Sequence, residues 1–503
     1  MTVDLNEFST SLRRSRVSLE ATLAVLIFAV FSVFVLTTTH RYLEPDDYSY
    51  RAAVAALASG HVRLDVAQYK ALARSLASSG VLPNNGLHGV GGALGLGQTG
   101  LGSFPPPTAQ GIAGRLAKGV GASGQLIPQW HEMASGYYMT EKNYGYVLLA
   151  TPFYLIGALN FEPIFYGGLA CFSLFVGARR WIGSRGGLFA VVLYIFSGLA
   201  ITFAWRSTME TFTDASLIAT GVGLLLLVFL ASEKSQRFRA IVGGFGFLAL
   251  SMATFTRYTD LVALVVALLA VIIFARRSQI SRTTLAIWFF VSALLMAAIA
   301  LFNFWAYGSF ISTGYSSGVI QFSVSSIWPN MTSVLPQVIV ALPASIFALS
   351  AIGYALLRYL RKGGKATDGE SHSCRQDLVI VASLAGAWFG FWLVYLAYSW
   401  TVNQSGAGLH VVRFYVPAIS FVALLGAFLI SKLPKTIAIG FAVAVVVLAF
   451  VSFYHLTGGS SNALGGGAHG PLGLGANGVF GPGQNGQFLG NPFTGGTAAG
   501  GVG

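Results

Sequence analysis

Three carboxylates lie within four residues in the segment Glu44-Pro-Asp-Asp-Tyr-Ser-Tyr50, a few residues after the first long apolar run. Only 9% of the chain is Asp, Glu, Lys or Arg, so this cluster is unusual for its composition. Carboxylates at the mouth of a hydrophobic helix lose hydration, and a chain keeps them there when they have a function. Asp46 and Asp47 could act as a general base, which takes a proton from a reacting group. The alternative is a solvated helix cap at an interface.

Cationic side chains that could bind an anion lie beside aromatic residues. Arg206, Arg257 and Arg413 each adjoin one aromatic residue, respectively Trp205, Tyr258 and Phe414. The guanidinium group binds phosphate through two parallel hydrogen bonds, which an ammonium group cannot do. The alternative is that each arginine reaches the membrane–water interface from the end of a span.

Length and composition indicate a helical membrane protein that crosses the bilayer many times. The chain has 503 residues, of which 54% are hydrophobic, and its mean hydropathy is +0.68. Apolar runs of about 20 residues recur along it, which is the length that spans a bilayer. The net charge of +13 is spread among these runs, which argues against nucleic-acid binding and for topology signals. The separated Cys171 and Cys374 predict neither a disulfide framework nor a thiolate metal site.

The apolar runs predict an all-α protein with about 11 transmembrane helices. The first run follows Arg13, Arg14 and Arg16 and is too long for an ordinary signal peptide, so we expect a retained signal anchor. The predicted spans are 18–38, 161–178, 187–205, 213–231, 240–256, 259–275, 284–306, 335–357, 378–400, 414–431 and 436–456.

The basic residues predict the orientation. With a cytoplasmic amino terminus (1–17), the inside loops hold 19 of the 30 lysines and arginines, and the short outside loops hold only Arg206, Arg257 and Arg413. This asymmetry follows the positive-inside rule. It also predicts that the apolar segment 144–159 does not cross, because a further span there would reverse every later loop. The carboxyl terminus is then extracytoplasmic.

Two further parts of the chain follow the amino-terminal segment 1–17 in this topology. The transmembrane domain covers 18–456 and contains a large extracytoplasmic loop, 39–160, with juxtamembrane helices. Within that loop, YSYRAAVAALASG and AQYKALARSLASSG each read as a helix closed by glycine. The glycine-rich tail, 457–503, shares an LGLG pattern with the glycine-rich part of the loop, so the two could contact each other, although composition alone also explains the pattern.

Four patches, in this order and all predicted to lie outside, resemble motifs of one family. They are EPDDYSYRAAVAALASG (44–60), EKNYGYVLLATPFYLIGAL (141–159), FNFWAYGSFISTGYS (302–316) and GLHVVRFYVPAIS (408–420). The patches resemble the GT-C superfamily of membrane glycosyltransferases, in particular the protein mannosyltransferase and lipid A aminoarabinose transferase group. The resemblance covers roughly residues 18–456. Gly145, Phe310 and Phe414 depart from the family pattern, which leaves the sugar and the acceptor open.

The resemblance implies an enzyme of the cell envelope that moves a sugar from a polyprenyl-phosphate carrier to a glycan, lipid or protein acceptor outside the cytoplasm. Its chemistry would need a base for the acceptor hydroxyl, cations for the phosphate and an apolar groove for the lipid. Adjacent carboxylates on a helix diverge by about 100°. We therefore expect one of them, Asp46 before Asp47, to face the pocket while the other caps a helix at Tyr48–Ser49.

The phosphate-binding residues are predicted to be Arg413 first, because it lies in a family-like patch, with Arg257 or Arg206. Further candidates for substrate or phosphate binding are Tyr258, His410 and Lys142, although a single interfacial histidine is commonly structural. Glu132, Glu141 and Lys142 flank the juxtamembrane segment. Glu210 and Asp214 lie near Arg206 in the sequence and could orient that arginine, contact a sugar or close a helix end.

No cofactor is predicted with certainty. Asp46 and Asp47 alone make a poor site for Mg²⁺ or Mn²⁺, so a divalent cation remains an open alternative without assigned metal ligands. Two other functions also stay open. One is a GT-C-like structural or assembly subunit without activity, which the glycine-rich segments would suit. The other is a transporter of lipid or sugar. Against it, the middles of the spans lack paired ionisable residues, and the chain shows no obvious inverted repeats.

Overall fold

The computed structural model describes residues 5–37, 45–78, 126–127, 129–133, 135–206, 208–231, 233–275, 280–311, 314, 321–362, 368–402 and 409–461. Side chains of 5–18, 45, 77–78, 275, 362, 368–373, 409–410 and 455–461 are not described. The possible contact between the glycine-rich loop and tail lies outside the described residues. The predicted tail boundary at 457 differs from the structure, because the last helix continues to Ser461.

The described chain is almost entirely helical, with one small hairpin. The long helices are α1 (Leu5–Thr37), α7 (Glu162–Ile195), α9 (Glu210–Leu230), α10 (Gln236–Thr256), α11 (Leu261–Ala275), α12 (Arg282–Tyr307), α15 (Ala344–Lys362), α16 (Asp368–Leu396), α19 (Ile419–Ile430) and α20 (Lys435–Ser461). The shorter elements are α2 (Pro45–Ala58), α3 (Val66–Ser78), β1 (Trp130–Glu132), β2 (Tyr138–Thr140), α6 (Tyr144–Leu155), η1 (Leu159–Phe161), α8 (Gly198–Trp205), η2 (Tyr258–Asp260), η3 (Val324–Ser326), α13 (Ile327–Ser333), α14 (Leu335–Ala341), α17 (Ser399–Val402), α18 (Leu409–Val412) and η4 (Arg413–Ala418).

Within the described residues, eight helices are long and apolar enough to cross a membrane, or nine if α14 and α15, bent by 97°, form one span. This establishes a multi-pass, all-α membrane protein. Two segments account for the difference between these nine and the 11 predicted spans. The shorter apolar helix Tyr258–Phe274 corresponds to the span predicted at 259–275. The single segment Leu159–Ile195 corresponds to two predicted spans.

The chain reverses direction inside α7. Gly183 has φ +82° and ψ 171°, a left-handed backbone that glycine adopts readily. A Cβ atom added to Gly187 would lie 2.8 Å from the carbonyl oxygen of Phe175, although twelve residues of straight helix would separate these positions by about 18 Å. The two halves of α7 therefore lie side by side, as the separate spans 161–178 and 187–205 predict.

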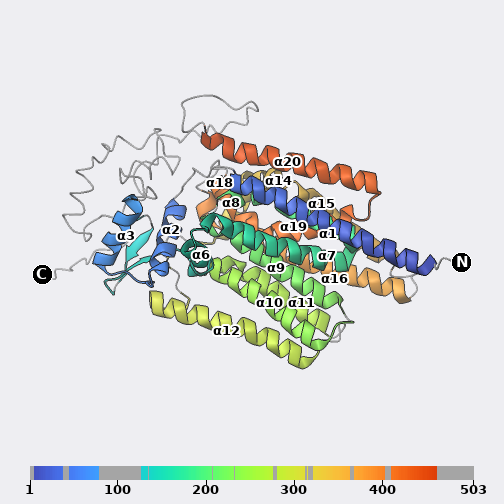
Figure 1. The fold of residues 1–503 in the computed structure, drawn as a ribbon, viewed down its shortest axis with the longest axis horizontal. Helices are drawn as coiled ribbons and strands as arrows, with labels where there is room; N and C mark the ends of the chain where they lie inside the picture. Colours follow the sequence, from blue (N-terminus) through green and yellow to red (C-terminus); the bar gives the residue numbers. More distant parts are fainter. Residues whose placement is uncertain are drawn as a thin grey trace.

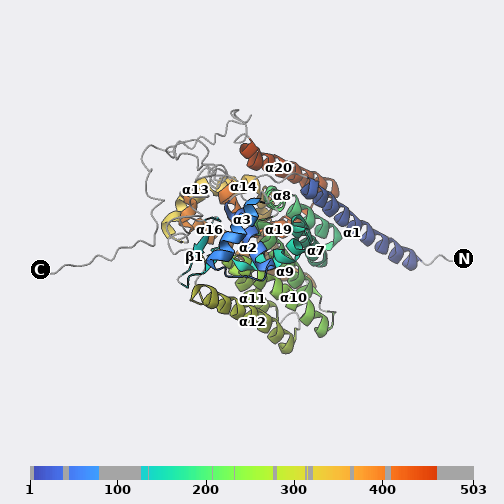
Figure 2. The same ribbon diagram turned by 60° about the vertical axis from the view of Figure 1, so that its left-hand side comes forward.

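Helices at the edge of the bundle expose apolar surface, whereas central helices are buried. The apolar windows of α1 and α12 are only 17% buried, against 72% for α9. In Figures 1 and 2, α12 and α20 lie on opposite sides of the bundle. Lipid tails solvate apolar side chains as well as a protein interior does, so this exposure is what a bilayer stabilises.

A small polar domain covers one end of the bundle. Figure 1 shows α2, α3 and the hairpin gathered at the end away from the amino terminus. Strands β1 and β2 are antiparallel, with Trp130 opposite Thr140 and Glu132 opposite Tyr138. Buried aromatic side chains form the core of this domain: the ring of Tyr69 stacks on that of Tyr138, with centroids 4.2 Å apart.

Helix α6 connects this domain to the bundle. It has 12 residues, so it extends about 18 Å, which is less than a bilayer span. A Cβ atom on Gly145 would overlap the backbone of Phe255 and Thr256 at the end of α10. Glycine at this position, where the family pattern has proline, allows α6 to approach α10 closely.

Candidate active site

Helix α2 carries the two adjacent carboxylates in its first turn. The helix begins at Pro45, whose fixed φ suits the first helical position. The predicted cap at Tyr48–Ser49 is therefore wrong, because both Asp46 and Asp47 already lie inside the helix. Their side chains point to different partners, as the turn of about 100° between neighbouring helical residues requires.

Asp46 lies at the centre of a group that we call the outer cluster: Asp46, Gln129, Glu141, Lys142 and Arg413. Its Oδ1 atom lies 2.9 Å from Lys142 Nζ and accepts a hydrogen bond of 2.7 Å from Gln129 Nε2. Its Oδ2 atom lies 2.7 Å from Arg413 Nη1. Sequence positions 46, 129, 142 and 413 thus meet at one carboxylate. Two predicted phosphate-binding residues, Lys142 and Arg413, contact the predicted base directly.

The hairpin positions Lys142 and Gln129 against α2. Ser49 Oγ and Thr140 Oγ1 share a hydrogen bond of 2.7 Å, which fastens the end of β2 to α2. Thr140 Oγ1 also accepts from the backbone N–H of Lys142 at 3.1 Å. Trp130, which is completely buried, lies at the start of β1 directly after Gln129. The site is therefore held by buried side chains of a folded domain.

Aromatic rings support Arg413 from the other side. The Arg413 guanidinium carbon lies 5.0 Å from the ring centroid of Phe414 and 5.8 Å from that of Trp400. The ring of Tyr395 stacks on Phe414 at 5.2 Å. An arginine over aromatic faces keeps its charge and its fork of donors in a defined orientation. Phe414, one of the departures from the family pattern, therefore forms part of the cation's support.

The cations determine the ionisation of Asp46. Burial alone would raise the pKa of the Asp46 carboxyl, but the Lys142 ammonium and the Arg413 guanidinium outweigh burial and hold this pKa well below its usual range. The side chain is 10% exposed, so it is accessible from one side. Burial also raises the pKa of the nearby Tyr398 hydroxyl, despite the opposing charges of Arg413 and Lys142. Asp46 is thus a carboxylate and Tyr398 a neutral phenol at neutral pH.

Asp47 has a different environment. It forms an ion pair with Arg206, and its Oδ1 accepts a hydrogen bond of 3.1 Å from Thr208 Oγ1. Both side chains of the ion pair are only 1% exposed. This pair joins α2 to the segment between α8 and α9. Of the two predicted catalytic carboxylates, Asp47 is sealed within the protein.

Arg257 belongs to a second group that we call the inner cluster: Arg257, Glu210, Asp214 and Asp260. Its Nη2 atom lies 2.9 Å from Glu210 Oε1, and its Nε atom lies 3.1 Å from Asp214 Oδ2. Of the alternatives for Glu210 and Asp214, the structure shows an ion pair at a helix end. The cation is Arg257 and not the neighbouring Arg206, because the first turns of α9 face the end of α10. Asp260 is completely buried nearby, and neither of its carboxylate oxygens has a hydrogen-bond partner among the described residues.

The two clusters touch through one backbone atom. Arg257 Nη1 donates a hydrogen bond of 3.4 Å to the carbonyl oxygen of Arg413. The Arg257 guanidinium also lies 5.9 Å from the Phe414 ring. The inner cluster thus supports the backbone of the residue that contacts Asp46.

The other residues singled out in the sequence have partners of their own where the structure describes their side chains. Tyr258 donates its hydroxyl proton to Asn303 Oδ1 at 2.8 Å. Within the described residues, its side chain forms no hydrogen bond to the outer or the inner cluster. The His410 side chain lies outside the described residues. Glu132 accepts from the hydroxyl of Tyr138 at 3.0 Å. Glu141 lies 3.8 Å from Lys142 Nζ and bonds to His131 Nε2 at 3.0 Å.

A divalent cation does not fit the acidic pair as it is arranged. Both oxygens of Asp46 already accept from cationic or amide donors, and Asp47 contacts Arg206 and Thr208. Among the described residues, no group of three or more His, Cys, Asp or Glu side chains is placed to hold a metal ion.

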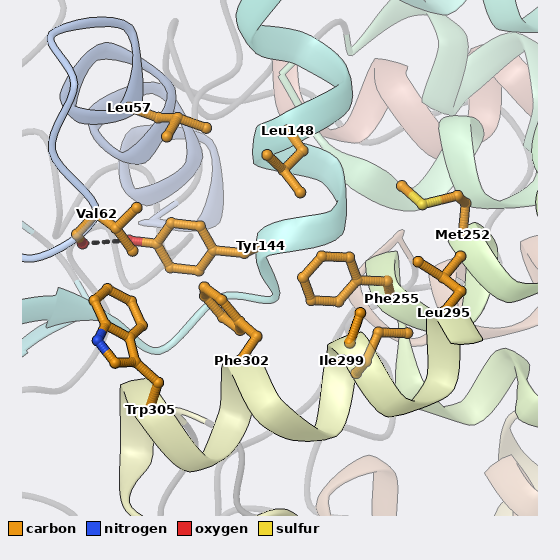
Figure 3. Close-up of a pocket in the computed structure, with 11 residues that line it drawn as sticks. Leu57, Val62, Tyr144, Leu148, Met252, Phe255, Leu295, Ile299, Phe302 and Trp305 are labelled. Atoms are coloured by element: carbon orange, nitrogen blue, oxygen red, sulfur yellow. Dashed lines mark hydrogen bonds between the residues drawn. The ribbon is translucent and has the colours of Figure 1, made fainter. Parts of the chain in front are cut away.

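An apolar cavity of about 380 Å³ lies near the outer cluster. Figure 3 shows side chains from α2, α6, α10 and α12 around it, with Tyr144 and Phe302 between Trp305 and Phe255. Its lining residues are Leu57, Val62, Tyr144, Leu148, Met252, Phe255, Leu295, Ala298, Ile299, Phe302 and Trp305. The Tyr144 hydroxyl donates to the carbonyl oxygen of Val62 at 2.8 Å, so the cavity wall has no free phenol. Tyr144 is two residues from Lys142, which links the cavity to the polar site.

Sequence reasoning missed several residues of the site. Gln129 has no motif, and its segment shows no clear periodicity. Thr208 and Tyr398 are common residue types with no distinguishing neighbours in the sequence. Asp260 and Arg257 are recognisable in the sequence as charges at the end of a span, but their grouping with Glu210 and Asp214 is not.

Comparison with known proteins gives two similar crystal structures, both of ArnT from Cupriavidus metallidurans. The structure bound to undecaprenyl phosphate is 12% identical, with a TM-score of 0.48, and the match covers 90% of this chain and 72% of the ArnT chain. The structure in the apo state is 13% identical, with a TM-score of 0.42, and the match covers 64% of this chain and 62% of that one.

No protein-family profile and no curated protein sequence matches this chain. The similarity to ArnT concerns the course of the chain, and at these TM-scores it carries no conclusion about function. The functional proposal rests on the outer cluster and on the sequence patches.

Proposed function

We propose that this protein is a membrane glycosyltransferase that moves a sugar from a polyprenyl-phosphate carrier to an extracytoplasmic acceptor. The observation that carries the proposal is the contact of one carboxylate, Asp46, with two cations, Lys142 and Arg413, at a partly exposed position at the end of a membrane bundle. A base beside a phosphate clamp is what direct displacement at a sugar phosphate requires.

Charge balance favours the outer cluster as the phosphate site. There, Lys142 and Arg413 face Asp46, with Glu141 at the longer distance of 3.8 Å. In the inner cluster, a single cation, Arg257, faces three acidic groups. A phosphate would be repelled from that excess of carboxylates, whereas in the outer cluster it can exchange with Asp46 as the partner of two cations. Arg257 and Arg206 then have structural roles next to the site.

The reaction balances with the groups of the outer cluster. The acceptor hydroxyl gives its proton to Asp46 while its oxygen bonds to the anomeric carbon of the sugar. The bond between that carbon and the phosphate oxygen breaks, and its electron pair leaves with the polyprenyl phosphate. Lys142 and Arg413 neutralise the charge that develops on the leaving phosphate. A single displacement inverts the configuration at the anomeric carbon.

This scheme requires the donor to change the state of Asp46. A carboxylate that accepts from two cations is a weak base, and the depressed pKa of Asp46 reflects this. When a phosphate takes over Lys142 and Arg413, those cations no longer stabilise the ionised carboxylate to the same extent, and its basicity rises. The base is therefore activated where and when the donor is bound, which limits proton transfer without substrate.

The apolar cavity suits the lipid chain of such a donor. Its walls come from α2, α6, α10, α12 and Val62 of the segment after α2, and the short connection from Lys142 to Tyr144 joins it to the polar site. Polyprenyl chains consist of apolar isoprene units, which an apolar cavity can hold without burying an unpaired polar group. A phosphate at Lys142 with its chain directed toward this cavity would satisfy both ends of the donor.

The orientation that completes the proposal places the amino terminus in the cytoplasm and the outer cluster outside. The chain supports this arrangement, because Arg180 and Arg358 belong to the end of the bundle opposite the site. Arg180 donates to the carbonyl oxygen of Leu230, at the other end of α9 from Glu210. Cysteines introduced at positions 470 and 365 test the orientation: an impermeant thiol reagent added outside should label the first and not the second, and the reverse pattern would overturn it.

The deciding experiment supplies purified protein with polyprenyl-phosphate-linked sugars of different kinds and measures the release of polyprenyl phosphate. We expect release with one donor class, with inversion at the anomeric carbon of the product. Parallel reactions with EDTA and with added Mg²⁺ or Mn²⁺ determine whether a divalent cation takes part. Absence of release from every donor, in a preparation that binds the donor, would overturn the enzyme and favour a non-catalytic subunit of a membrane complex.

A further inference from the structure

Gln129 has a backbone conformation that its residue type disfavours. Among the described residues, it is the only non-glycine residue with a positive φ, +60°. A side chain with a Cβ atom is strained in this left-handed region, so the conformation persists only where the surroundings impose it. Such outliers occur preferentially at functional sites.

Contacts on both sides impose this conformation. The carbonyl oxygen of Gln129 accepts from the backbone N–H of Glu141 at 3.0 Å, and the next residue, Trp130, is fully buried. Two residues earlier, the backbone N–H of Ile127 donates to the hydroxyl of Tyr69 at 2.9 Å. With its neighbours fixed, the left-handed turn at Gln129 directs its side chain toward α2.

The carboxamide of Gln129 is only half used in this position. Its Nε2 atom donates to Asp46 Oδ1 at 2.7 Å. Its Oε1 atom is buried and has no hydrogen-bond donor among the residues that the structure describes. An amide oxygen can accept two hydrogen bonds, and leaving it buried without one is unfavourable. The strained backbone therefore holds an unsatisfied acceptor directly beside the proposed base.

We propose that Gln129 binds the acceptor substrate and that this acceptor is a polyhydroxylated molecule, such as a glycan, with a second hydroxyl next to the reacting one. This inference rests on the proposed function. Gln129 Nε2 and Lys142 Nζ contact the same atom, Asp46 Oδ1. When the donor phosphate draws Lys142 away, a hydroxyl that takes its place at Oδ1 lies beside the carboxamide. That hydroxyl has one proton, which goes to Asp46, so the Gln129 oxygen needs a donor from a neighbouring hydroxyl.

The test compares two acceptors of similar apolar chain, octyl glucoside and octanol, with protein in a sugar-free detergent. We expect wild-type protein to use octyl glucoside at least roughly tenfold more efficiently, since one hydrogen bond is worth about that factor. Gln129→Met should lower kcat/KM for octyl glucoside roughly tenfold more than kcat/KM for octanol, because the lost contact with Asp46 affects both acceptors equally and the lost carboxamide oxygen affects only the glucoside. The donor KM should stay unchanged. Gln129→Gly should show the same acceptor loss without a lower unfolding temperature, because glycine relieves the backbone strain.

Gln68→Met is the matched control in the same domain. Gln68 Oε1 accepts from the backbone N–H of Asp65 at 3.0 Å and does not contact Asp46, so we expect unchanged use of both acceptors. Equal use of octanol and octyl glucoside by wild-type protein would overturn the inference, as would an equal loss for both acceptors in Gln129→Met. If no donor releases polyprenyl phosphate with either acceptor, the proposed function itself fails. That outcome differs from an active enzyme that uses both acceptors equally, which would overturn only the role of Gln129.

Discussion

The outer and inner clusters are adjacent groups of charges with opposite designs. In the outer cluster, one carboxylate, Asp46, accepts from two cations and remains partly exposed. In the inner cluster, one cation, Arg257, faces several carboxylates, of which Asp214 and Asp260 are fully buried. Both lie at the same end of the bundle, and Arg257 of the inner cluster donates a hydrogen bond to the backbone carbonyl oxygen of Arg413 in the outer cluster. Position at this end of the bundle therefore does not by itself make a charged cluster suitable for binding a phosphate. The ratio of cations to carboxylates distinguishes the two clusters.

The neighbours Asp46 and Asp47 show the same contrast within a single helical turn. Removing a hydrogen-bonded charge from water is unfavourable unless its partners compensate, and breaking a sealed pair leaves the remaining charge without solvent. Asp47 and Arg206 are such a sealed pair, with 1% exposure each. Asp46 can exchange its partners for a substrate because solvent reaches it. We infer that stability depends mainly on Asp47 and chemistry on Asp46, and this division can be tested.

The largest expected effect is the loss of turnover in Asp46→Asn. Asparagine keeps the shape of the side chain but has almost no basicity, and removal of a general base typically slows a reaction about 10²–10⁴-fold. We expect folded protein that still binds the donor and is nearly inactive, as measured by release of polyprenyl phosphate and by a donor-binding assay. Full turnover in both Asp46→Asn and Asp47→Asn would show that neither residue is the base.

The second effect is the loss of stability in Asp47→Asn. The change leaves the buried Arg206 without its carboxylate, and breaking a buried pair from one side costs about 3–5 kcal/mol. We expect a lower unfolding temperature and a lower yield of monodisperse protein. Glu233→Gln is the control, because the pair between Glu233 and Arg180 is 50% and 42% exposed and should contribute only about 0–1 kcal/mol. Similar stability of the two variants would contradict the contrast between Asp46 and Asp47.

The third effect concerns donor affinity. Arg413→Ala removes charge-assisted hydrogen bonds to the phosphate, which are worth about 1.5–3 kcal/mol, so the donor KM should rise roughly 10- to 100-fold. Arg413→Lys should restore only part of this, because lysine lacks the planar fork. Arg180→Ala, at the opposite end of the bundle, should leave the donor KM unchanged. An unaltered donor KM in Arg413→Ala would place the phosphate on other cations.

Much of the architecture could be predicted from hydropathy, because apolar runs long enough to span a bilayer have few other uses. The gap between the apolar runs 161–178 and 187–205 predicts the reversal at Gly183. The asymmetry of the basic residues predicts that the apolar segment containing α6 does not cross the membrane. The pairing of charges could not be predicted in the same way. Glu210 follows Arg206 by four residues, yet it bonds Arg257, because the direction in which α9 starts depends on packing at the end of α10.

The outer cluster illustrates the same limit. Asp46 and Lys142 could be recognised because charges are rare in this chain and lie next to apolar helices. Gln129 could not, because a left-handed glutamine has no sequence signature and arises only from the contacts of its neighbours. Sequence reasoning therefore identifies the charged members of the outer cluster and misses the neutral residue that donates a hydrogen bond to one of them.

The smallest expected effect is a nearly constant contribution of Asp46 to stability between pH 7 and 5. The cations that face Asp46 are Lys142 and Arg413, which stay charged throughout this range. The other titratable groups next to these cations are Glu141 and Tyr398. Because the folded-state pKa of Asp46 lies below its ordinary value of about 3.9, the unfolded chain takes up the proton first as the pH falls. The stabilisation by the ion pairs is therefore fully present well above about pH 4 and is lost below it.

The measurement is the difference in unfolding free energy between wild type and Asp46→Asn at several pH values, which cancels the titration of groups common to both proteins. We expect this difference to change by less than about 0.5 kcal/mol from pH 7 to pH 5, within the range of an ordinary surface substitution, and to shrink below about pH 4. Arg413→Gln, which removes one of the two cations, should raise the pKa of Asp46 and move the onset of the loss to higher pH. If the difference in unfolding free energy between wild type and Asp46→Asn already falls between pH 7 and pH 5, Lys142 and Arg413 do not hold Asp46 ionised. Asp46 would then be a base with an ordinary or raised pKa, which would not need the donor phosphate to release it.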